Sequence, residues 1–359
     1  MPLSAPSRRR RGNRGNHRHR GASVGALGQV GMVLALAGSL AGCQGQPAAE
    51  IGVYSGRHYN TDKELYRAFT ARTGIRVRLL EGKDSALIER VRTEGAQTQA
   101  DVLVLVDAAR LERAARLGLL QPVRSVALER DVPAGLRDPE GRWFALTRRV
   151  RLLVLDPSLP DGLVRGYHDL ARPELRGRLC LRDSRSVYNQ SLVADQLIRR
   201  GEAATAAWVR GMVANLGQPL FSSDIPLARA VARGECGAAL VNSYYVARML
   251  SGDAGRDDQA LARKLRVVMP DPAHVNVSGA GVTRHSRQVA AATRLVEFLA
   301  SPEGGRGYAA ANHEYPVRGN SDDPILQAFG PLRSDGVGAA QLGERNAAAV
   351  ALMQANGWR

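Results

Sequence analysis

Two adjacent tyrosines, Tyr244 and Tyr245, stand where an apolar segment gives way to a predicted helix. Residues 238–241 are apolar and predict a short buried strand, and Asn242 or Ser243 would supply the N-cap of the helix. Open α/β sheets bind ligands at junctions of this kind. The pair therefore predicts two phenol oxygens at the mouth of a cleft, although two aromatics packing between lobes would leave the same pattern.

Two further strand-to-helix turns carry side chains of similar chemistry. His58 and Tyr59 follow a predicted strand at 51–55, and Tyr188 follows one at 178–182. Only 9 of the 359 residues are tyrosine and only 5% are aromatic, so packing alone does not explain this convergence. We therefore expect the three turns to present phenol or imidazole groups to one ligand.

Phenol and imidazole groups together suit ferric iron. Fe³⁺ is a small, hard ion and favours anionic oxygen over thiolate or neutral donors. A free phenol loses its proton only at about pH 10, but a bound cation removes the proton at lower pH. Three or four phenolates would offset or slightly exceed the charge of the ion, and an imidazole could fill a remaining position. Arg57 or Arg248 could balance any excess negative charge.

Strands and helices alternate along the chain, which predicts an α/β protein with a parallel sheet. The first part has predicted strands at 51–55, 75–80 and 100–106, and predicted helices from 61 onward, at 84–94 and at 107–117. The middle has an extended stretch at 142–155, a strand at 178–182, and helices ending at 200 and spanning 202–214 and 223–233. After the tyrosine unit come strands at 265–269 and 275–283, a helix at 287–300, an extended segment within 310–317 and a helix at 341–355.

Six short segments occur in an order typical of one known family. They are SGRHYNTD (55–62), ADV (100–102), YNQS (188–191), NSYY (242–245), VNVSGAG (275–281) and NHEYP (312–316). Together they resemble the ferric-iron-binding proteins of ABC importers, the transferrin-like branch of the extracytoplasmic solute-binding proteins. The likeness covers roughly residues 51–357.

This resemblance implies a two-lobed periplasmic-binding-protein fold of type II, with mixed sheets, flanking helices and crossover strands, which closes on Fe³⁺ like a flytrap. Lobe 1 would comprise 51–149 and 276–326, and lobe 2 would comprise 150–275 and 327–359. The implied partners are an ABC permease and its ATPase, with no nucleic acid, and the protein would act as a monomer without catalysis.

The resemblance also implies a ligand set. The matching positions are His58, Tyr59, Tyr188, Tyr244 and Tyr245, with Arg57 and Arg248 behind them. Some members use a glutamate after the ADV motif together with an exogenous anion, whereas this chain has Val106-Asp107 there. It is therefore similar to the tyrosine-rich subtype, in which Tyr59 and Tyr188 take the place of that carboxylate.

The amino-terminal segment predicts export. Residues 1–42 carry seven arginines and no acidic residue, which leaves +9 of the net charge of +16 on the rest, without a basic run. An apolar run at 24–40 follows, and it ends in Leu-Ala-Gly-Cys, which is typical of a lipoprotein signal peptide cut before a lipidated Cys43. Residues 43–50 would then form a tether, and the protein would be periplasmic or held at the cell surface. A nucleic-acid arm, a twin-arginine signal and a buried helix are the alternatives.

Cys180 and Cys236 are the two remaining cysteines. In an exported protein a disulfide is their natural pairing, and two separate buried thiols are the alternative.

Common catalytic and nucleotide-binding motifs (GxxxxGK[ST], GxGxxG, HExxH and GxSxG) are absent from the sequence. His274 and His313 remain as notable histidines, and lone loop histidines are most often solvated surface groups. With no nucleophile–base pair apparent, we expect a receptor rather than an enzyme. The alternative is a binder of an organic or anionic small molecule, in which the tyrosines stack or donate hydrogen bonds.

Overall fold

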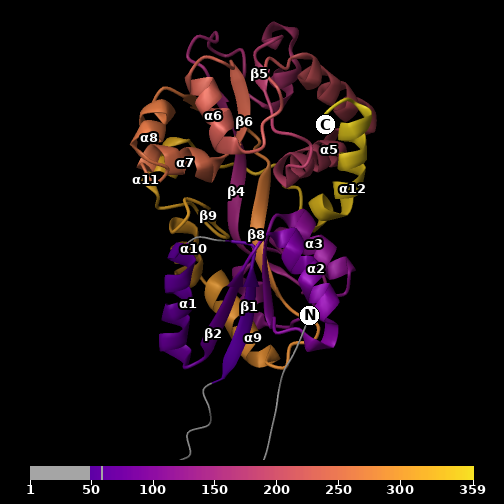
Figure 1. Ribbon diagram of the computed structural model, residues 1–359, viewed down its shortest axis with the longest axis vertical. Coiled ribbons are helices and arrows are strands. Elements are labelled where there is room, and N and C mark those ends of the chain that lie inside the picture. The colour runs from indigo at the N-terminus through magenta and orange to yellow at the C-terminus, as the bar shows by residue number, and fades with distance from the viewer. Residues whose placement is uncertain (1–48, 58–59) are drawn as a thin grey trace, which may run out of the picture. The chain divides into compact units, whose positions relative to one another are not determined.

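A single mixed sheet organises the described residues, with strand order β2-β1-β3-β8-β4-β6-β5 and with β7 and β9 also paired to β4. The computed structural model describes residues 49–57 and 60–359 (Figure 1). The strands are β1 (Glu50–Ser55), β2 (Arg76–Glu81), β3 (Val102–Val106), β4 (Phe144–Leu155), β5 (Leu179–Cys180), β6 (Ala238–Asn242), β7 (Arg266–Val268), β8 (Val275–Val282) and β9 (Tyr315–Pro316). The pairs β1–β2, β1–β3 and β5–β6 are parallel, whereas the pairs that involve β4 or β8 are antiparallel.

The long strand β4 joins the two halves of this sheet. Its residues up to Val150 pair with β8, and its residues from Arg151 onward pair with β6. Alternate side chains enter two hydrophobic clusters, with Leu153 in one and Leu152 in the other. Because both faces are buried, the strand reads as a nearly continuous apolar run after Arg151. The extended stretch predicted at 142–155 is therefore one uninterrupted strand.

Helices cover the sheet on both faces. They are α1 (Asn60–Thr73), α2 (Asp84–Glu94), α3 (Ala108–Arg116), α4 (Val126–Asp131), α5 (Val187–Ala214), α6 (Asp224–Ala232), α7 (Ser243–Ser251), α8 (Arg256–Ala262), α9 (Val289–Ala300), α10 (Pro302–Ala310), α11 (Pro324–Ala328) and α12 (Ala339–Ala355). Helix α1 contacts α9 and α10, α2 contacts α3, and α12 contacts both α3 and α5 (Figure 1). Strands β1, β3 and β6 are each followed directly or within a few residues by a helix, so their carboxyl ends lie near helix N-termini.

Most of the predicted elements are present within a few residues. The two helices predicted on either side of residue 201 are the two parts of α5, which breaks at Gly201, where φ is +78°. Helix α10 was not expected, because its segment PEGGRGYAA contains three glycines. It forms with Pro302 in the first turn and the Ser301 hydroxyl accepting a hydrogen bond from the Gly304 amide.

Several predictions concern residues outside the described ranges. The signal peptide at 1–42, the lipidated Cys43, and the ligands His58 and Tyr59 all fall there. The predicted tether at 43–50 is too long at its end, because Glu50 is the first residue of β1. The described residues from 49 onward belong to one compact unit, and the division into two lobes stays a prediction. Within the described part of the chain, the helices are too short or too polar to cross a membrane.

Cys180 and Cys236 form the predicted disulfide, with their Cα atoms 5.8 Å apart. Both are buried, and the link joins β5 to the turn before β6. The two cysteines are 56 residues apart in sequence, so their cross-link should stabilise the fold by about 2–4 kcal/mol, mainly by restricting the unfolded chain.

We expect the Cys180→Ala/Cys236→Ala variant to lose about 2–4 kcal/mol of its free energy of unfolding, as measured in urea. Equal stability of the variant and the oxidised parent would contradict this expectation.

Candidate metal centre

A cavity of about 260 Å³ opens where several strand-to-helix turns meet. Tyrosines from the N-terminal turns of α5 and α7 face charged side chains from the first third of the chain across this cavity. The lining residues are Gly56, Arg57, Lys83, Asp84, Ser85, Val106, Arg110, Tyr188, Tyr244, Tyr245 and Glu314. The structure thus brings the three described tyrosines of the predicted ligand set into one cavity.

The phenol oxygens of Tyr188 and Tyr244 lie 3.2 Å apart, with the Tyr244 hydroxyl donating to Tyr188. Octahedral oxygen ligands at about 2.1 Å from a small hard cation lie about 3 Å from one another along an edge. The ring of Tyr245 packs against that of Tyr244, with centroids 4.2 Å apart and planes tilted by 37°. The spacing of the two hydroxyls therefore suits two ligands of one small cation.

The end of β6 leads directly into α7 and so places the tyrosine pair at the start of the helix. The predicted N-cap hydrogen bond does not hold this junction. Asn242 is the N-cap residue of α7, yet its side chain makes no capping hydrogen bond. Its amide oxygen instead accepts from the Arg151 guanidinium at 3.1 Å. Arg151 is itself fixed by Asp224 at 2.8 Å, so a buried ion pair holds the end of β6 and thereby the start of α7.

Two arginines lie beside the ring of Tyr188. The guanidinium carbons of Arg149 and Arg182 lie 5.3 and 5.5 Å from its centroid. Arg149 is fully buried and donates to the Ser278 hydroxyl at 2.8 Å, and Arg182 is bonded to Asp224 at 2.6 Å. Their positive charges can offset the negative charge that phenolate oxygens would bring to the cavity.

Arg57 is one of the charged residues that line the cavity, and it is almost completely buried. It donates to Asp62 at 3.0 Å and to Glu314 at 2.5 Å, and its guanidinium carbon lies 4.1 Å from the ring centroid of Tyr308. Glu314 also accepts from the Thr147 hydroxyl at 2.8 Å. The arginine predicted to balance the phenolates is therefore also paired with two buried carboxylates.

Asp84 begins α2 and supplies a second carboxylate to the cavity lining. Its side chain accepts from the Val106 amide at 2.9 Å and from Arg110 at 2.5 Å. A Cβ atom at Gly56 would lie only 1.9 Å from the Oδ1 atom of Asp84, so the close approach of this turn to α2 requires glycine.

Asp107 directly follows the cavity-lining Val106 in sequence, and its side chain forms hydrogen bonds with other parts of the protein. It is fully buried, accepts from the Ser191 hydroxyl at 2.8 Å and from the Asn276 amide at 2.9 Å, and caps α3 through the Ala109 amide. Burial raises the pKa of this carboxyl group, against the charge of Arg149 and these hydrogen bonds. It links β3 to α5 and β8 and does not line the cavity.

The other predicted residues lie apart from the tyrosines. Arg248, on α7, is half-buried and is not among the described residues that line the cavity. His313 contacts Asp323 at 2.5 Å and Asp253 at 3.1 Å, and His274 is fully buried rather than solvated. Both histidines therefore differ from the expected surface groups.

Some residues around the cavity were not predicted. Asp84 is the first residue of α2, shortly after β2, so the same strand-to-helix rule could have found it. Arg149 lies inside β4, and Glu314 directly precedes β9. Neither occupies a strand-to-helix turn, so only tertiary pairing brings them to the cavity.

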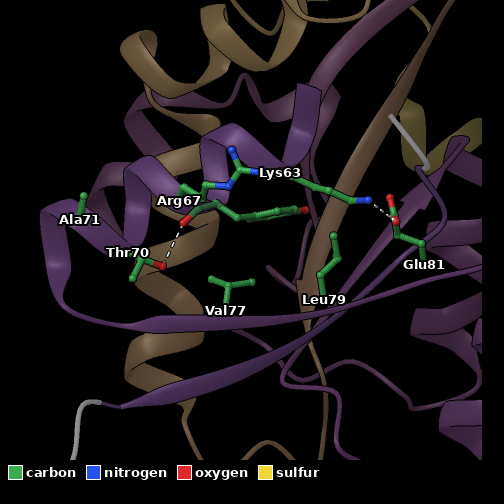
Figure 2. A pocket seen from close by; sticks show the side chains of 8 residues that line it. Lys63, Arg67, Thr70, Ala71, Val77, Leu79 and Glu81 are labelled. Atoms are coloured by element: carbon green, nitrogen blue, oxygen red, sulfur yellow. Dashed lines mark hydrogen bonds and ion pairs between the residues drawn. The ribbon is translucent and has the colours of Figure 1, made fainter. Parts of the chain in front are cut away.

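A second hollow, of about 580 Å³, lies between α1 and β2. Figure 2 shows Val77 and Leu79 of β2 facing α1, with Lys63 paired to Glu81 at 3.2 Å. Tyr188, Tyr244 and Tyr245, the described members of the predicted ligand set, do not line it, and most of its described lining side chains are apolar or cationic. Its one carboxylate, Glu81, is paired with Lys63, so the hollow lacks the set of anionic oxygens that a ferric ion requires.

Residues 97–329 match the family of bacterial extracellular solute-binding proteins, and the chain belongs to this family. It is 41% identical over 317 residues to iron uptake protein A1 of Synechocystis sp., covering 86% of this chain and 88% of that protein. It is 30% identical over 316 residues to the major ferric iron-binding protein of Neisseria meningitidis serogroup B, covering 86% of this chain and 93% of the relative.

A solved structure shares the fold. A Trichodesmium protein in complex with iron and citrate aligns with a TM-score of 0.83 at 38% identity, covering 87% of this chain and 100% of that one. These comparisons confirm the resemblance to ferric-binding proteins and the predicted α/β fold class of type II periplasmic binding proteins. The family consists of solute-binding proteins rather than enzymes, in agreement with the expectation of no catalysis.

Proposed function

We propose that this protein is an extracytoplasmic receptor that binds Fe³⁺ in the tyrosine cavity and delivers it to an ABC permease and its ATPase. The observation that carries the proposal is the 3.2 Å separation of the Tyr188 and Tyr244 hydroxyls, with the ring of Tyr245 packed against Tyr244. Two phenols so close would repel each other once ionised, and a hard trivalent cation removes that repulsion. Relatives named for ferric iron binding and iron uptake support the same ion.

The proposed ligands are Tyr188, Tyr244 and Tyr245, completed by His58 and Tyr59, which follow the cavity-lining Arg57 in sequence. Three phenolates neutralise the ferric charge, and a fourth is balanced by the arginines beside Tyr188. Arg57 contributes by holding Glu314 in place, and Arg248 lies in the last turn of α7. The two predicted lobes would close around the ion.

The experiment that tests this function is a titration of metal-free protein with ferric citrate, followed by visible absorption. We expect a tyrosinate-to-iron charge-transfer band that saturates at one ion per chain. Calorimetry with citrate alone provides the comparison for the alternative function. Tight binding of citrate without iron, and no band with iron, would instead identify a receptor for an organic anion.

The alternative function, the binding of an organic or anionic small molecule, has one specific observation in its favour. Arg57, Lys83 and Arg110 all line the cavity and give it a cationic side. Arg57 and Arg110 are ion-paired with carboxylates, whereas Lys83 is exposed at the edge. We therefore infer that an anion such as citrate accompanies the iron, as in the Trichodesmium complex, rather than replacing it.

Iron should be released when the pH falls, and not when it rises. Phenolates and the imidazole must lose their protons to bind the metal, so protons compete with iron. We expect the charge-transfer band of the loaded protein to weaken progressively as the pH falls below neutral and to remain when the pH rises. A stopped-flow measurement with a ferric chelator present would follow the loss, and a band independent of pH would contradict tyrosinate ligation.

We propose that Cys43 anchors the receptor to the membrane through lipid after cleavage of residues 1–42. Metabolic labelling with a fatty acid tests this part separately. Label should enter the native protein and be lost in Cys43→Ala. Equal labelling of both would exclude this anchor without affecting the iron proposal.

A further inference from the structure

Away from the tyrosine cavity, the structure buries a cluster of two carboxylates and an imidazole. Asp195 lies on α5, His274 directly precedes β8, and Asp335 lies in the segment before α12. One oxygen or nitrogen atom from each lies within 4.8 Å of the others, and the Nδ1 atom of His274 is 3.7 Å from the Oδ2 atom of Asp335. The three side chains are at most 1% exposed.

Several atoms of this cluster have no hydrogen-bond partner among the described residues. They are both ring nitrogens of His274, the Oδ1 atom of Asp195 and the Oδ2 atom of Asp335. A buried polar atom without a partner destabilises the folded state, and native proteins contain few of them. Four such atoms from three neighbouring side chains therefore indicate that something else satisfies them.

The remaining carboxylate oxygens are held from outside the cluster. The Oδ2 atom of Asp195 accepts from the Gln196 amide at 2.7 Å, and Asp335 accepts from the Val337 backbone amide at 3.0 Å through Oδ1. Each carboxylate thus has one oxygen fixed by a neighbour and the other left open. Metal-binding carboxylates are commonly oriented by outer hydrogen bonds in this manner.

Hydrogen bonds from the backbone also fix the segments that carry His274 and Asp335 relative to each other. The Asp335 amide donates to the Ala273 carbonyl at 3.0 Å, and the Ala273 amide donates to the Arg333 carbonyl at 2.8 Å. The His274 amide donates to the Tyr167 hydroxyl at 3.0 Å. The positions of His274 and Asp335 are therefore set before any ligand enters, as a preformed site requires.

Few other charged groups among the described residues lie near the cluster. The nearest described cation is Arg199, whose Nη1 atom lies 3.9 Å from the outer oxygen of Asp195, while the buried hydroxyl of Tyr167 is the other nearby titratable group. Burial raises the pKa of Asp195 to about 7, with Asp335 adding to the effect and His274 and Arg199 opposing it. Burial also works against ionisation of Asp335, but the adjacent His274 outweighs it and lowers that pKa. The cluster thus keeps two carboxyl groups and one imidazole buried together, with a single arginine at its edge.

We propose that Asp195, His274 and Asp335 form a structural site for a divalent cation of the Zn²⁺ class. One imidazole nitrogen and two carboxylate oxygens are donors that zinc accepts, and a water molecule can complete four-coordination. Mg²⁺ and Ca²⁺ prefer six or more oxygen ligands, which three side chains do not supply. A 2+ ion offsets the two carboxylates and joins α5, β8 and the segment before α12.

The test is metal retention after refolding of the full chain. Protein unfolded in denaturant with a chelator, with its disulfide intact, is refolded with or without zinc chloride and analysed for bound metal. We expect one zinc ion per chain and a higher melting temperature with zinc. His274→Ala and the nearly isosteric Asp195→Asn should each lower zinc affinity at least about 100-fold, since each removes a ligand.

Matched controls separate this site from the iron site. His313 also contacts two aspartates, and His313→Ala should retain zinc. A Tyr188→Phe/Tyr244→Phe/Tyr245→Phe variant should also retain zinc, and Asp195→Asn should still bind ferric citrate. Zinc affinity should fall about tenfold per pH unit below neutral, because the metal must displace a proton. Absence of bound zinc, equal retention in His274→Ala and Asp195→Asn, or loss only in the tyrosine variant would each overturn the proposal.

Discussion

Replacing Tyr244 and Tyr245 together with phenylalanine is expected to lower ferric affinity at least about 1000-fold, a loss of about 4 kcal/mol in binding free energy. The change removes two anionic oxygens beside Tyr188, whose hydroxyl lies 3.2 Å from that of Tyr244. A single remaining phenolate in the described part of the cavity cannot neutralise the ferric charge. Titration with ferric citrate, monitored by the charge-transfer band and by bound iron, measures the loss.

Tyr54→Phe is the matched control for this pair. The Tyr54 hydroxyl contacts Glu94 at 3.1 Å and lies outside the cavity lining. The control should therefore bind iron as the parent does. A full-strength band in Tyr244→Phe/Tyr245→Phe would remove the tyrosine pair from the site, and Tyr188→Phe alone should give an intermediate loss with a shifted band.

Replacing Arg57 with methionine is expected to lower the free energy of unfolding by about 3–5 kcal/mol, the range for breaking a buried ion pair by removing one partner. The substitution leaves Asp62 and Glu314 buried without their shared cation, to which they lie 3.0 and 2.5 Å away. It also removes the guanidinium stacked on Tyr308 at 4.1 Å. Urea denaturation of the metal-free protein measures the effect.

Two comparisons show whether burial is the cause. Arg72→Met breaks a pair with Glu303 in which both side chains are more than half exposed, and it should cost less than about 1 kcal/mol. Arg57→Lys keeps the charge but not the forked geometry, so we expect a loss between the other two. Equal losses for Arg57→Met and Arg72→Met would show that the buried pairing contributes little.

The tyrosine side of the candidate site could be predicted from sequence because one local rule applies to it. Tyr188 and Tyr244 each occur at the start of a helix, and the carboxyl ends of the strands bring such positions to one edge of the sheet. Asp84 obeys the same rule and could have been included. Glu314 and Arg149 depend on the pairing of β4 with β8 and β9, which no local pattern specifies.

The fold shows the same division between local and tertiary information. The break of α5 at Gly201 and the single long strand β4 follow from local residue type and from apolar continuity. Helix α10 contradicts local propensity, since three glycines disfavour it, and packing against α1, α9 and β9 stabilises it. His274 was interpreted as a solvated loop histidine, and only the tertiary structure shows that it is buried beside Asp195 and Asp335.

A crystal structure of the iron-loaded protein, with anomalous data collected at the iron absorption edge, tests the central claim most directly. We predict a single strong peak within bonding distance of the hydroxyl oxygens of Tyr188, Tyr244 and Tyr245. A peak elsewhere, or iron-loaded crystals in which these hydroxyls still bond to each other with no metal between them, would contradict the account.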